Sequence, residues 1–459
     1  MQQDLTLERR ISESEAPCTP SGALDGLTIM RYAHGYRDRS SGGVEQYLRR
    51  LDRELLRRHR LTVLQMHLSK NDTTSTIEVE EVGLGRILWV PVATHQADSM
   101  LFDLPSRVRH VYRQTLQLCQ QKGEGHYQAM FRSARNLTRN RAGHLRYRTA
   151  TLSDNLLHLL ATHKVDLLAL HWLNYDTGAL ISMALRTGLP FVFINHFDNA
   201  RFSLSLTRKL IAQAAAIGAV SDQGVPEDLR TRCVNLSDSV DIEFFAPKYA
   251  QSLPLTTHPV VLLPARVQYG KGHRDMIEAM QILTERKISL SLCFAGAVDS
   301  DALHRELRAI AVQMGLEKRV IFLGEQTPEK IRDWYAQSCA VALPSYSEGL
   351  PRVLLEAQSM KKPVVAYDSG GISQAILPNE TGFLIKQGDV RALADKIGIL
   401  LQNETQRLRM GELGREFVSR KFSLSALVQR HEAFYVKALS VTSPKAARPT
   451  PQENMPQRA

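Results

Sequence analysis

Two glutamates at a fixed spacing are the residues of this sequence that most clearly suggest chemistry. Glu348 and Glu356 are separated by seven residues, and the intervening Gly349-Leu350-Pro351 is typical of a tight turn that opens a helix. Proline is favoured at the first helical position, and the free N–H groups and positive dipole end of a helix start suit a diphosphate. In the second turn, the Glu356 carboxylate can accept hydrogen bonds from two adjacent ribose hydroxyls. Glu348 would lie before the helix, near where a sugar carried by that diphosphate would project.

A second group of residues places positive charge before another predicted helix. In PARVQYGKGHRDMIEAM, residues 264–280, Arg266 ends a predicted strand and Lys271 follows five residues later between Gly270 and Gly272. Two cations on a loop that glycines make flexible can flank a pyrophosphate and stabilise it as a leaving group. The competing interpretation is a loop with two surface cations.

Two further candidates lie in the first half of the chain. Gly42 and Gly43, in SSGGVEQYL, precede the amphipathic segment 44–58, and glycines there let a substrate approach the backbone closely. His196 follows the apolar run FVFIN, and open α/β sheets bind ligands beyond the ends of their strands. A structural turn and a structural histidine are the competing interpretations. We favour His196 over His171, which follows DLLAL.

Two series of short apolar runs must position these residues. The runs are rich in β-branched residues and bounded by Gly, Pro or polar residues, which is typical of buried parallel strands. The first series extends from LTIM (27–30) to AIGAVS (216–221), and the second from VVLLPA (260–265) to PVVAY (363–367). Helical patterns lie between them, so we predict an α/β protein with two doubly wound parallel-sheet domains.

We place the first domain at residues 23–246 and the second at residues 247–440. The last helix of the second domain is expected to pack back on the first domain. Residues 1–22 and 441–459 are polar with few large apolar side chains, and we expect both to be disordered tails. Residues 101–150 are predicted to be a mostly helical insertion in the first domain.

The positive charge of the chain is concentrated in that insertion. The net charge is +11, and residues 104–150 contain ten basic residues and one acidic residue, Glu124. This pattern suggests an anionic partner, such as a membrane surface or a phosphorylated acceptor, although a solvated helical face would also explain it. We expect no nucleic-acid partner. The sequence shows no apolar run of the ~20 residues that span a bilayer, no secretory signal and no paired cysteines. We therefore expect a cytoplasmic protein, peripheral on the inner face of the membrane through residues 104–150.

Residues 344–371, PSYSEGLPRVLLEAQSMKKPVVAYDSGG, closely resemble the Glu-x7-Glu signature of family 4 retaining glycosyltransferases. The resemblance continues in N-E-T-G-F-L, residues 379–384. It implies a GT-B fold, in which two Rossmann-like domains face a cleft, the first on the acceptor side and the second binding a nucleotide-sugar. Arg266 and Lys271 resemble the family's R-x4-K-G pair, which contacts the donor diphosphate. Gly42-Gly43 and His196 resemble a loop near the donor phosphate and a histidine near the transferred sugar.

The resemblance implies a retaining glycosyltransferase that moves a sugar from a nucleotide-diphosphate donor, a UDP- or GDP-sugar, to a saccharide or lipid-linked acceptor. The pathway would be polysaccharide or glycoconjugate biosynthesis. No cofactor is expected and, because the sequence shows no obvious D-x-D metal motif, no catalytic metal. The implied catalytic residues are Glu348, Arg266, Lys271 and His196. The implied donor-binding residues are Gly42, Gly43, Arg266, Lys271, Glu348, Gly349, Leu350, Pro351 and Glu356.

We weigh four other functions against this one. An inverting GT-B transferase with His196 as general base, or a sugar-nucleotide epimerase, would share the fold. A phosphorylase would need a pyridoxal-binding lysine, and no pattern here supports one. A membrane-associated, non-enzymatic scaffold would use the basic segment, but the intact Glu-x7-Glu region argues against it.

The sequence departs from the family pattern in two places. SDSVDIEFFAP, residues 237–247, resembles the hinge N-G-V-D-x-x-x-F-x-P, but Asp238 and Ser239 replace Asn-Gly. Gln374 occupies a position where family members often carry Glu. We expect neither departure to touch the donor-binding core.

Overall fold

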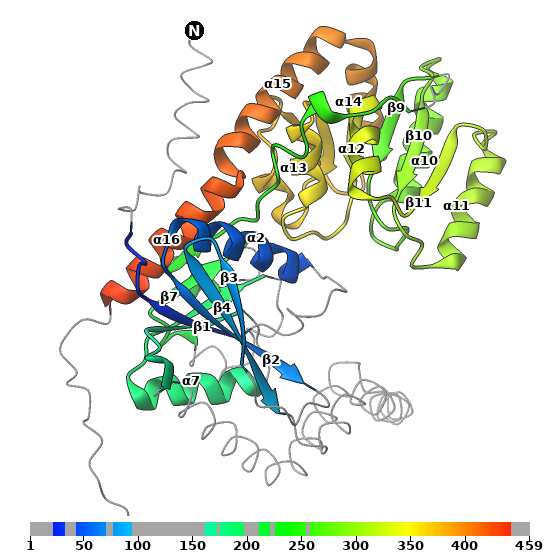
Figure 1. Ribbon diagram of the computed structural model, residues 1–459. Helices are drawn as coiled ribbons and strands as arrows, with labels where there is room; N and C mark the ends of the chain where they lie inside the picture. The colour runs from blue at the N-terminus through cyan, green and yellow to red at the C-terminus, as the bar shows by residue number, and fades with distance from the viewer. Residues whose placement is uncertain are drawn as a thin grey trace, which may run out of the picture.

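The computed structural model describes residues 22–32, 43–69, 77–93, 160, 162–171, 175–196, 211–220, 225–253 and 258–441. Within these ranges the chain forms two α/β domains, each built on its own sheet (Figure 1). The predicted insertion at 101–150 lies outside the described residues, as do residues 1–21 and 442–459.

The first sheet has the strand order β3-β4-β2-β1-β5-β6-β7-β8. Its strands are β1 Thr28–Tyr32, β2 Thr62–Ser69, β3 Glu78–Val82, β4 Gly85–Ala93, β5 Leu167–Leu170, β6 Phe191–Asn195, β7 Ala216–Ala219 and β8 Cys233–Asn235. All neighbouring pairs in it are parallel except β3 and β4, which form an antiparallel hairpin at the sheet edge. The antiparallel β3 differs from the prediction of a parallel sheet. Its EVEEV sequence is mostly exposed, which is possible for a strand at the edge of a sheet.

Side chains alternate between the two faces of this sheet, as the pleat of a strand requires. Ile29 lies in the buried cluster covered by α2, Gly43–Arg58, whereas Met30 lies in the cluster covered by α7, Tyr175–Thr187. A short helix, α9 Glu227–Arg230, precedes β8. The residues of α2 that recur at helical spacing and are buried are Tyr47, Leu48, Leu51 and Leu55.

The second sheet is parallel throughout, with the strand order β11-β10-β9-β12-β13-β14. Its strands are β9 Val260–Leu263, β10 Ser291–Ala295, β11 Val320–Gly324, β12 Ser338–Leu343, β13 Val364–Tyr367 and β14 Gly382–Ile385. Its helices are α10 His273–Glu285, α11 Asp301–Gln313, α12 Pro328–Gln337, α13 Arg352–Ser359, α14 Val390–Gln402 and α15 Glu404–Lys421. Two 3-10 turns, η3 Pro247–Tyr249 and η4 Gly370–Gln374, lie in its loops.

Helices cover both faces of the second sheet. Along β9, Val261 and Leu263 pack with residues of α10, α11 and α14, while Val260 and Leu262 pack with residues of α12, α13 and α15. Burial on both faces explains why the strands of this domain are almost continuously apolar. The prediction of two doubly wound α/β domains is therefore confirmed.

The last described helix, α16 Leu424–Val441, returns to the first domain and lies beside α2 (Figure 1). Leu427, Phe434 and Tyr435 of α16 are buried in the same cluster as Leu48 and Leu51 of α2. The domains are thus joined both by the segment before residue 247 and by α16. No helix among the described residues is long and apolar enough to cross a membrane.

Candidate functional site

The first feature of the site is an ion pair between two loops at the carboxyl ends of neighbouring strands. Lys271 lies in the loop after β9, and Glu348 lies in the loop after β12. The Lys271 Nζ is 2.6 Å from the Glu348 Oε1, and both side chains are partly exposed, by 23% and 15%. Since the pair is reachable from solvent, a bound anion or sugar could contact either member.

Two glycines let these loops approach each other. Gly272, the N-cap of α10, has φ 74°, and a Cβ there would lie 2.1 Å from the Pro344 carbonyl oxygen. Gly370 has φ 56°, and a Cβ there would lie 1.8 Å from the carbonyl oxygen of Glu348, which accepts a hydrogen bond from the Gly371 N–H at 3.0 Å. Only glycine tolerates both the left-handed backbone and the close approach. The Gly-Gly turn after β13 therefore holds the backbone of Glu348.

The helix that follows Glu348 is α13, and its start differs slightly from the sequence prediction. Pro351 is the N-cap of α13 and Arg352 is the first helical residue, so the expectation that Pro351 opens the helix is wrong by one position. Pro351 offers no side-chain cap, and the first amides of a helix have no intrahelical acceptor. Leu350, in the preceding turn, packs against the buried clusters of both domains. This turn is thus in contact with the first domain.

Glu356 lies in the second turn of α13, as predicted, but it is buried. Its Oε2 accepts a hydrogen bond from the Tyr335 hydroxyl at 3.0 Å, and its Oε1 is 3.6 Å from the Arg352 Nη2. Burial raises the pKa of Glu356, while the Arg352 charge and the Tyr335 hydrogen bond oppose that rise. The sequence did not identify Tyr335 or Arg352 as neighbours of this carboxylate.

Arg266 forms a salt bridge away from the Lys271–Glu348 pair. Its Nη1 is 2.8 Å from the Oδ2 of Asp299, in the loop after β10, and its side chain is 61% exposed. The structure thus brings Lys271 and Glu348 together but pairs Arg266 with a different carboxylate. An exposed ion pair contributes little to stability, so Arg266 can exchange Asp299 for an anionic ligand at small cost.

His196 directly follows β6 and is half-buried beside aromatic residues of the first domain. Its Nε2 is 2.9 Å from the Nδ1 of His171, which follows β5, and the two rings stack with centroids 5.2 Å apart. The Tyr47 and His196 rings form a T-shaped pair with their centroids 5.0 Å apart. Burial, and then the Arg31 charge, lower the pKa of His196 to about 3. His171, which the sequence analysis ranked below His196, is its direct partner.

For the predicted glycines, the structure gives only backbone positions. Gly43 is the first residue of α2, and Gly42 lies outside the described residues. Gly349 has open space where a Cβ would be, so its position does not require glycine for steric reasons. Among the described residues, no group of three or more His, Cys, Asp or Glu could hold a metal ion.

Both departures from the family pattern take part in contacts between the domains. Asp238 Oδ2 is 3.8 Å from the Arg352 Nε of α13, and the Asn235 amide donates to Gln374 Oε1 at 3.3 Å. Within the described part of the chain, Asp238 has no direct contact with the predicted donor-binding residues, but Arg352, which it faces, also contacts Glu356. The sequence pattern could not reveal a contact between segments more than a hundred residues apart.

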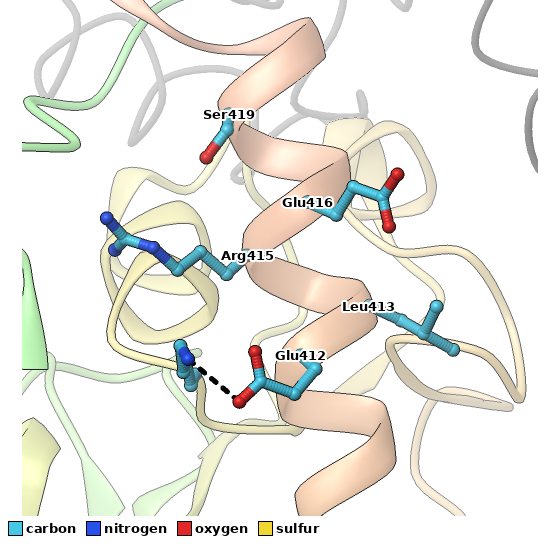
Figure 2. Close-up of a pocket in the computed structure, with 6 residues that line it drawn as sticks. Glu412, Leu413, Arg415, Glu416 and Ser419 are labelled. Carbon is cyan, nitrogen blue, oxygen red and sulfur yellow. Dashed lines mark hydrogen bonds and ion pairs between the residues drawn. The ribbon is translucent and has the colours of Figure 1, made fainter.

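A depression elsewhere on the second domain contains none of the predicted site residues. It is lined by Lys361 and, on α15, by Glu412, Leu413, Arg415, Glu416 and Ser419 (Figure 2). The Lys361 Nζ pairs with Glu412 at 2.8 Å, and Arg415 donates to the carbonyl oxygens of Ser359 and Phe245. Because these charges already serve packing of α15 on α13, we do not place the functional site there.

Comparison with known proteins agrees with the second-domain geometry. Residues 246–417 match the family described as glycosyl transferases group 1. The chain is 28% identical over 327 residues to a D-inositol 3-phosphate glycosyltransferase of Corynebacterium glutamicum, covering 63% of this chain and 77% of the relative. It is 31% identical over 215 residues to the protein of that name in Corynebacterium efficiens, covering 44% of this chain and 50% of the relative.

Solved structures share the fold over nearly the whole chain. A glycosyltransferase from Rickettsia africae superposes with a TM-score of 0.63 at 16% identity, covering 90% of this chain and 98% of the other. HepE of Anabaena, solved in complex with UDP, superposes with a TM-score of 0.58 at 16% identity, covering 88% and 98%. The resemblance seen in the sequence is confirmed. The chain is a glycosyltransferase enzyme with a GT-B fold, and its second domain carries the sequence pattern of the group 1 glycosyltransferases.

Proposed function

We propose that the protein transfers a sugar from a UDP-sugar to a saccharide or lipid-linked acceptor with retention of the anomeric configuration. The observation that carries this proposal is the arrangement around the start of α13. The Lys271–Glu348 pair lies just before the helix, and the buried Glu356 lies in its second turn. Uridine is the nucleoside we choose because HepE, which shares the fold, was solved with UDP.

Each group has a role in this proposal. The uncapped N-terminus of α13 faces the diphosphate with its free amides. Lys271 exchanges part of its contact with Glu348 for a phosphate oxygen and stabilises the charge that grows on the leaving UDP. Glu348 then accepts a hydrogen bond from the donor sugar, and Glu356 accepts hydrogen bonds from the ribose hydroxyls. Arg266 releases Asp299 to join Lys271 at the diphosphate.

Retention is favoured over inversion by the state of His196. An inverting transferase needs a general base, and such a base is most effective with a pKa near the working pH. Burial lowers the pKa of His196 to about 3, and its Nε2 is engaged with His171. In the front-face route, the acceptor hydroxyl gives its proton to the departing phosphate, so no enzyme base is needed.

Product analysis tests this proposal. The enzyme is incubated with UDP-sugars and a panel of acceptors that includes inositol phosphate, because the similar proteins carry D-inositol 3-phosphate in their names. Release of UDP and the anomeric proton coupling of the product are measured by NMR. Transfer with retained anomeric configuration supports the proposal. An inverted product would assign the inverting mechanism, and a changed UDP-sugar without transfer would assign an epimerase.

A further inference from the structure

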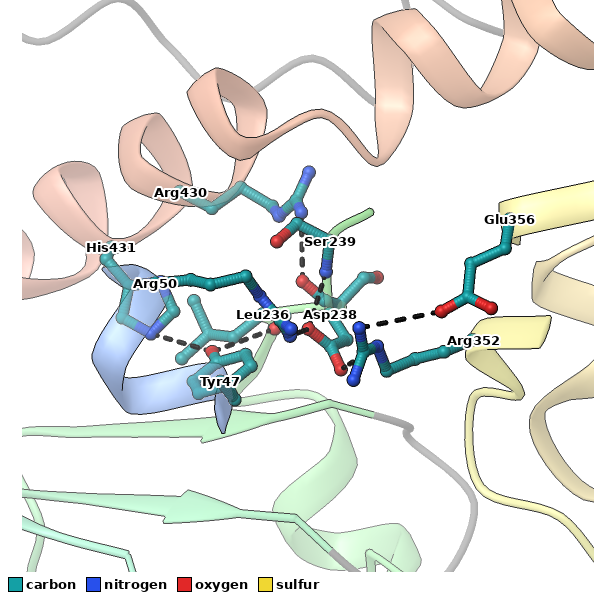
Figure 3. Close-up of polar contacts among 10 residues, drawn as sticks. Tyr47, Arg50, Leu236, Asp238, Ser239, Arg352, Glu356, Arg430 and His431 are labelled. Carbon is teal, nitrogen blue, oxygen red and sulfur yellow. Dashed lines mark hydrogen bonds and ion pairs between the residues drawn. The ribbon is translucent and has the colours of Figure 1, made fainter. Parts of the chain in front are cut away.

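A chain of charged side chains connects the first domain to the helix that carries Glu356 (Figure 3). Arg50 of α2 places its Nη2 2.8 Å from the Asp238 Oδ1. On its other side, the Asp238 Oδ2 is 3.8 Å from the Nε of Arg352, the first residue of α13. The Arg352 Nη2 is 3.6 Å from the Glu356 Oε1. Arg352 therefore lies between two carboxylates. One is that of Asp238, in the segment that connects the two domains (the interdomain segment), and the other is that of Glu356, in the predicted nucleotide site.

The segment that carries Asp238 is fixed by the first domain and by α16. The Tyr47 hydroxyl of α2 donates to the Leu236 carbonyl oxygen at 3.2 Å. Arg430 of α16 donates to the Ser237 carbonyl oxygen at 3.0 Å (Figure 3). Asp238 itself accepts a hydrogen bond from the Ser239 N–H at 2.7 Å and is 7% exposed. The Asp238 carboxylate is thus a fixed anchor, not a mobile surface charge.

The contacts with Arg50 and Arg352 depend on the negative charge of Asp238. The similar hinge pattern has Asn at this position, and an amide would face the guanidinium groups of Arg50 and Arg352 without a negative charge. A carboxylate accepts charge-assisted hydrogen bonds, which are about twice as strong as neutral ones. Burial and, to a smaller extent, the Arg352 charge lower the pKa of Arg50, and Asp238 opposes that change. The pair therefore keeps the Arg50 charge stable at the contact between the domains.

Four groups from four elements face the Glu356 carboxylate. They are Arg352 of its own helix, Tyr335 of α12, Arg50 of α2 and Asp238 of the interdomain segment. Burial raises the pKa of Glu356, Arg352 is the strongest of the opposing influences, and the Asp238 charge adds to the rise. Without Arg352, the buried carboxylate would be protonated at a higher pH.

We propose that Arg352 and Asp238 are positioning residues for Glu356. Asp238, held by Arg50, orients Arg352, and Arg352 keeps the Glu356 carboxylate ionised and aimed at the donor ribose. Nucleotide binding by the second domain then depends on a contact with the first domain. This inference rests on the proposed function, in which Glu356 accepts hydrogen bonds from the ribose. Neither Arg352 nor Asp238 touches the reacting atoms.

The pH dependence of UDP affinity tests the link from Arg352 to Glu356. Arg352→Gln keeps a polar side chain and removes its charge, at a position where the side chain is 28% exposed, so we expect the variant to fold. UDP affinity is measured by calorimetry between pH 5 and pH 8 for the full chain. The pH below which affinity falls should rise by about one unit, the effect of losing one neighbouring cation. Titration of UDP itself is common to all variants and cancels in the comparison.

Two control variants separate this role from a structural one. Arg352→Lys keeps the charge and should keep the wild-type pH profile. Arg415→Gln also removes an arginine that supports α13, through the Ser359 carbonyl oxygen, but it has no contact with Glu356. It should lower stability without moving the pH profile. An equal shift in Arg352→Gln and Arg415→Gln would overturn the inference.

A double-mutant cycle tests the link from Asp238 to Arg352. At pH 7.5, Asp238→Asn and Arg352→Gln should each weaken UDP binding several-fold, and the double variant should bind no more weakly than the weaker single variant. Independent, multiplying effects, or wild-type affinity in Asp238→Asn, would overturn the inference. If UDP affinity does not depend on Glu356 at all, the proposed function fails instead. If it depends on Glu356 but Arg352→Gln leaves the pH profile in place, only the positioning role fails.

Discussion

Replacing Gly370 with alanine tests whether the turn after β13 positions Glu348. Gly370 has φ 56°, and its new Cβ would lie 1.8 Å from the Glu348 carbonyl oxygen, whereas real Cβ contacts essentially never fall below 3.0 Å. One of the two backbone segments must therefore move by about 1 Å. Overpacking of this kind costs roughly 1–3 kcal/mol, and an alanine in the left-handed region adds about 1 kcal/mol. We expect the free energy of unfolding of Gly370→Ala to fall by about 2–4 kcal/mol.

The loss of activity should exceed what this loss of stability explains. A displacement of about 1 Å at a catalytic group can lower the rate by about 10²-fold. Stability is measured by urea denaturation, and kcat/KM is measured at a temperature where circular dichroism shows the variant folded. We expect kcat/KM to fall by about 10²-fold under these conditions.

Gly315→Ala is the matched control. Gly315 has φ 66°, but a Cβ there would meet no atom within 4 Å. This variant should lose about 1 kcal/mol of stability from the backbone strain alone and keep its activity. If the two folded variants had the same kcat/KM, the Gly370 turn would not position Glu348, and the reasoning would be refuted.

Three further predictions concern charge. Replacing Lys271 or Arg266 with alanine should lower kcat/KM by about 10²-fold, and near-normal turnover in both would place the diphosphate elsewhere. Burial lowers the pKa of His431 from 6.5 to about 3. Between these two pH values the unfolded chain binds a proton that the folded chain does not, so the free energy of unfolding falls as the pH drops. His431→Gln should therefore flatten the dependence of unfolding free energy on pH by about 1.4 kcal/mol per pH unit, and an unchanged slope in urea titrations would count against the buried neutral histidine. Through residues 104–150, the protein should co-sediment with anionic but not with neutral liposomes. Binding should fall with added salt and in a Gln variant of this segment. Equal binding to both vesicle types would exclude an electrostatic membrane contact. The arginines replaced in that variant are Arg132, Arg135, Arg139 and Arg141.

The sequence predicted the features that depend on local pattern. Short apolar runs such as VVLLPA predicted parallel strands, and the Gly349-Leu350-Pro351 turn predicted a helix start that the structure places one residue later, at Arg352. Lys271 was expected at the donor diphosphate and Glu348 near the donor sugar, and the structure pairs these two side chains at 2.6 Å. Hydrophobic periodicity and turn chemistry are local signals, so they can be recognised in the sequence without knowledge of the tertiary structure.

The features that the sequence missed depend on contacts between distant segments. Asp238 was read as a harmless departure, yet it lies against Arg352, and His171 was ranked below His196, yet the two rings stack. Whether two charges meet depends on the relative placement of two domains and on side-chain directions, which no local pattern records. The burial of Glu356 under Tyr335 was missed for the same reason.

The affinity for nucleoside diphosphates tests the central claim most directly. UDP, GDP and ADP are titrated by calorimetry into the wild type, into Glu356→Ala and into Glu412→Ala. Glu412 serves as the control because it is an exposed glutamate of α15, paired with Lys361. The wild type and Glu412→Ala should bind UDP equally, and Glu356→Ala should bind it more weakly by about 1.5–3 kcal/mol, the contribution of hydrogen bonds to a charged group. No binding of any nucleotide to the wild type, or unchanged affinity in folded Glu356→Ala, would contradict the account.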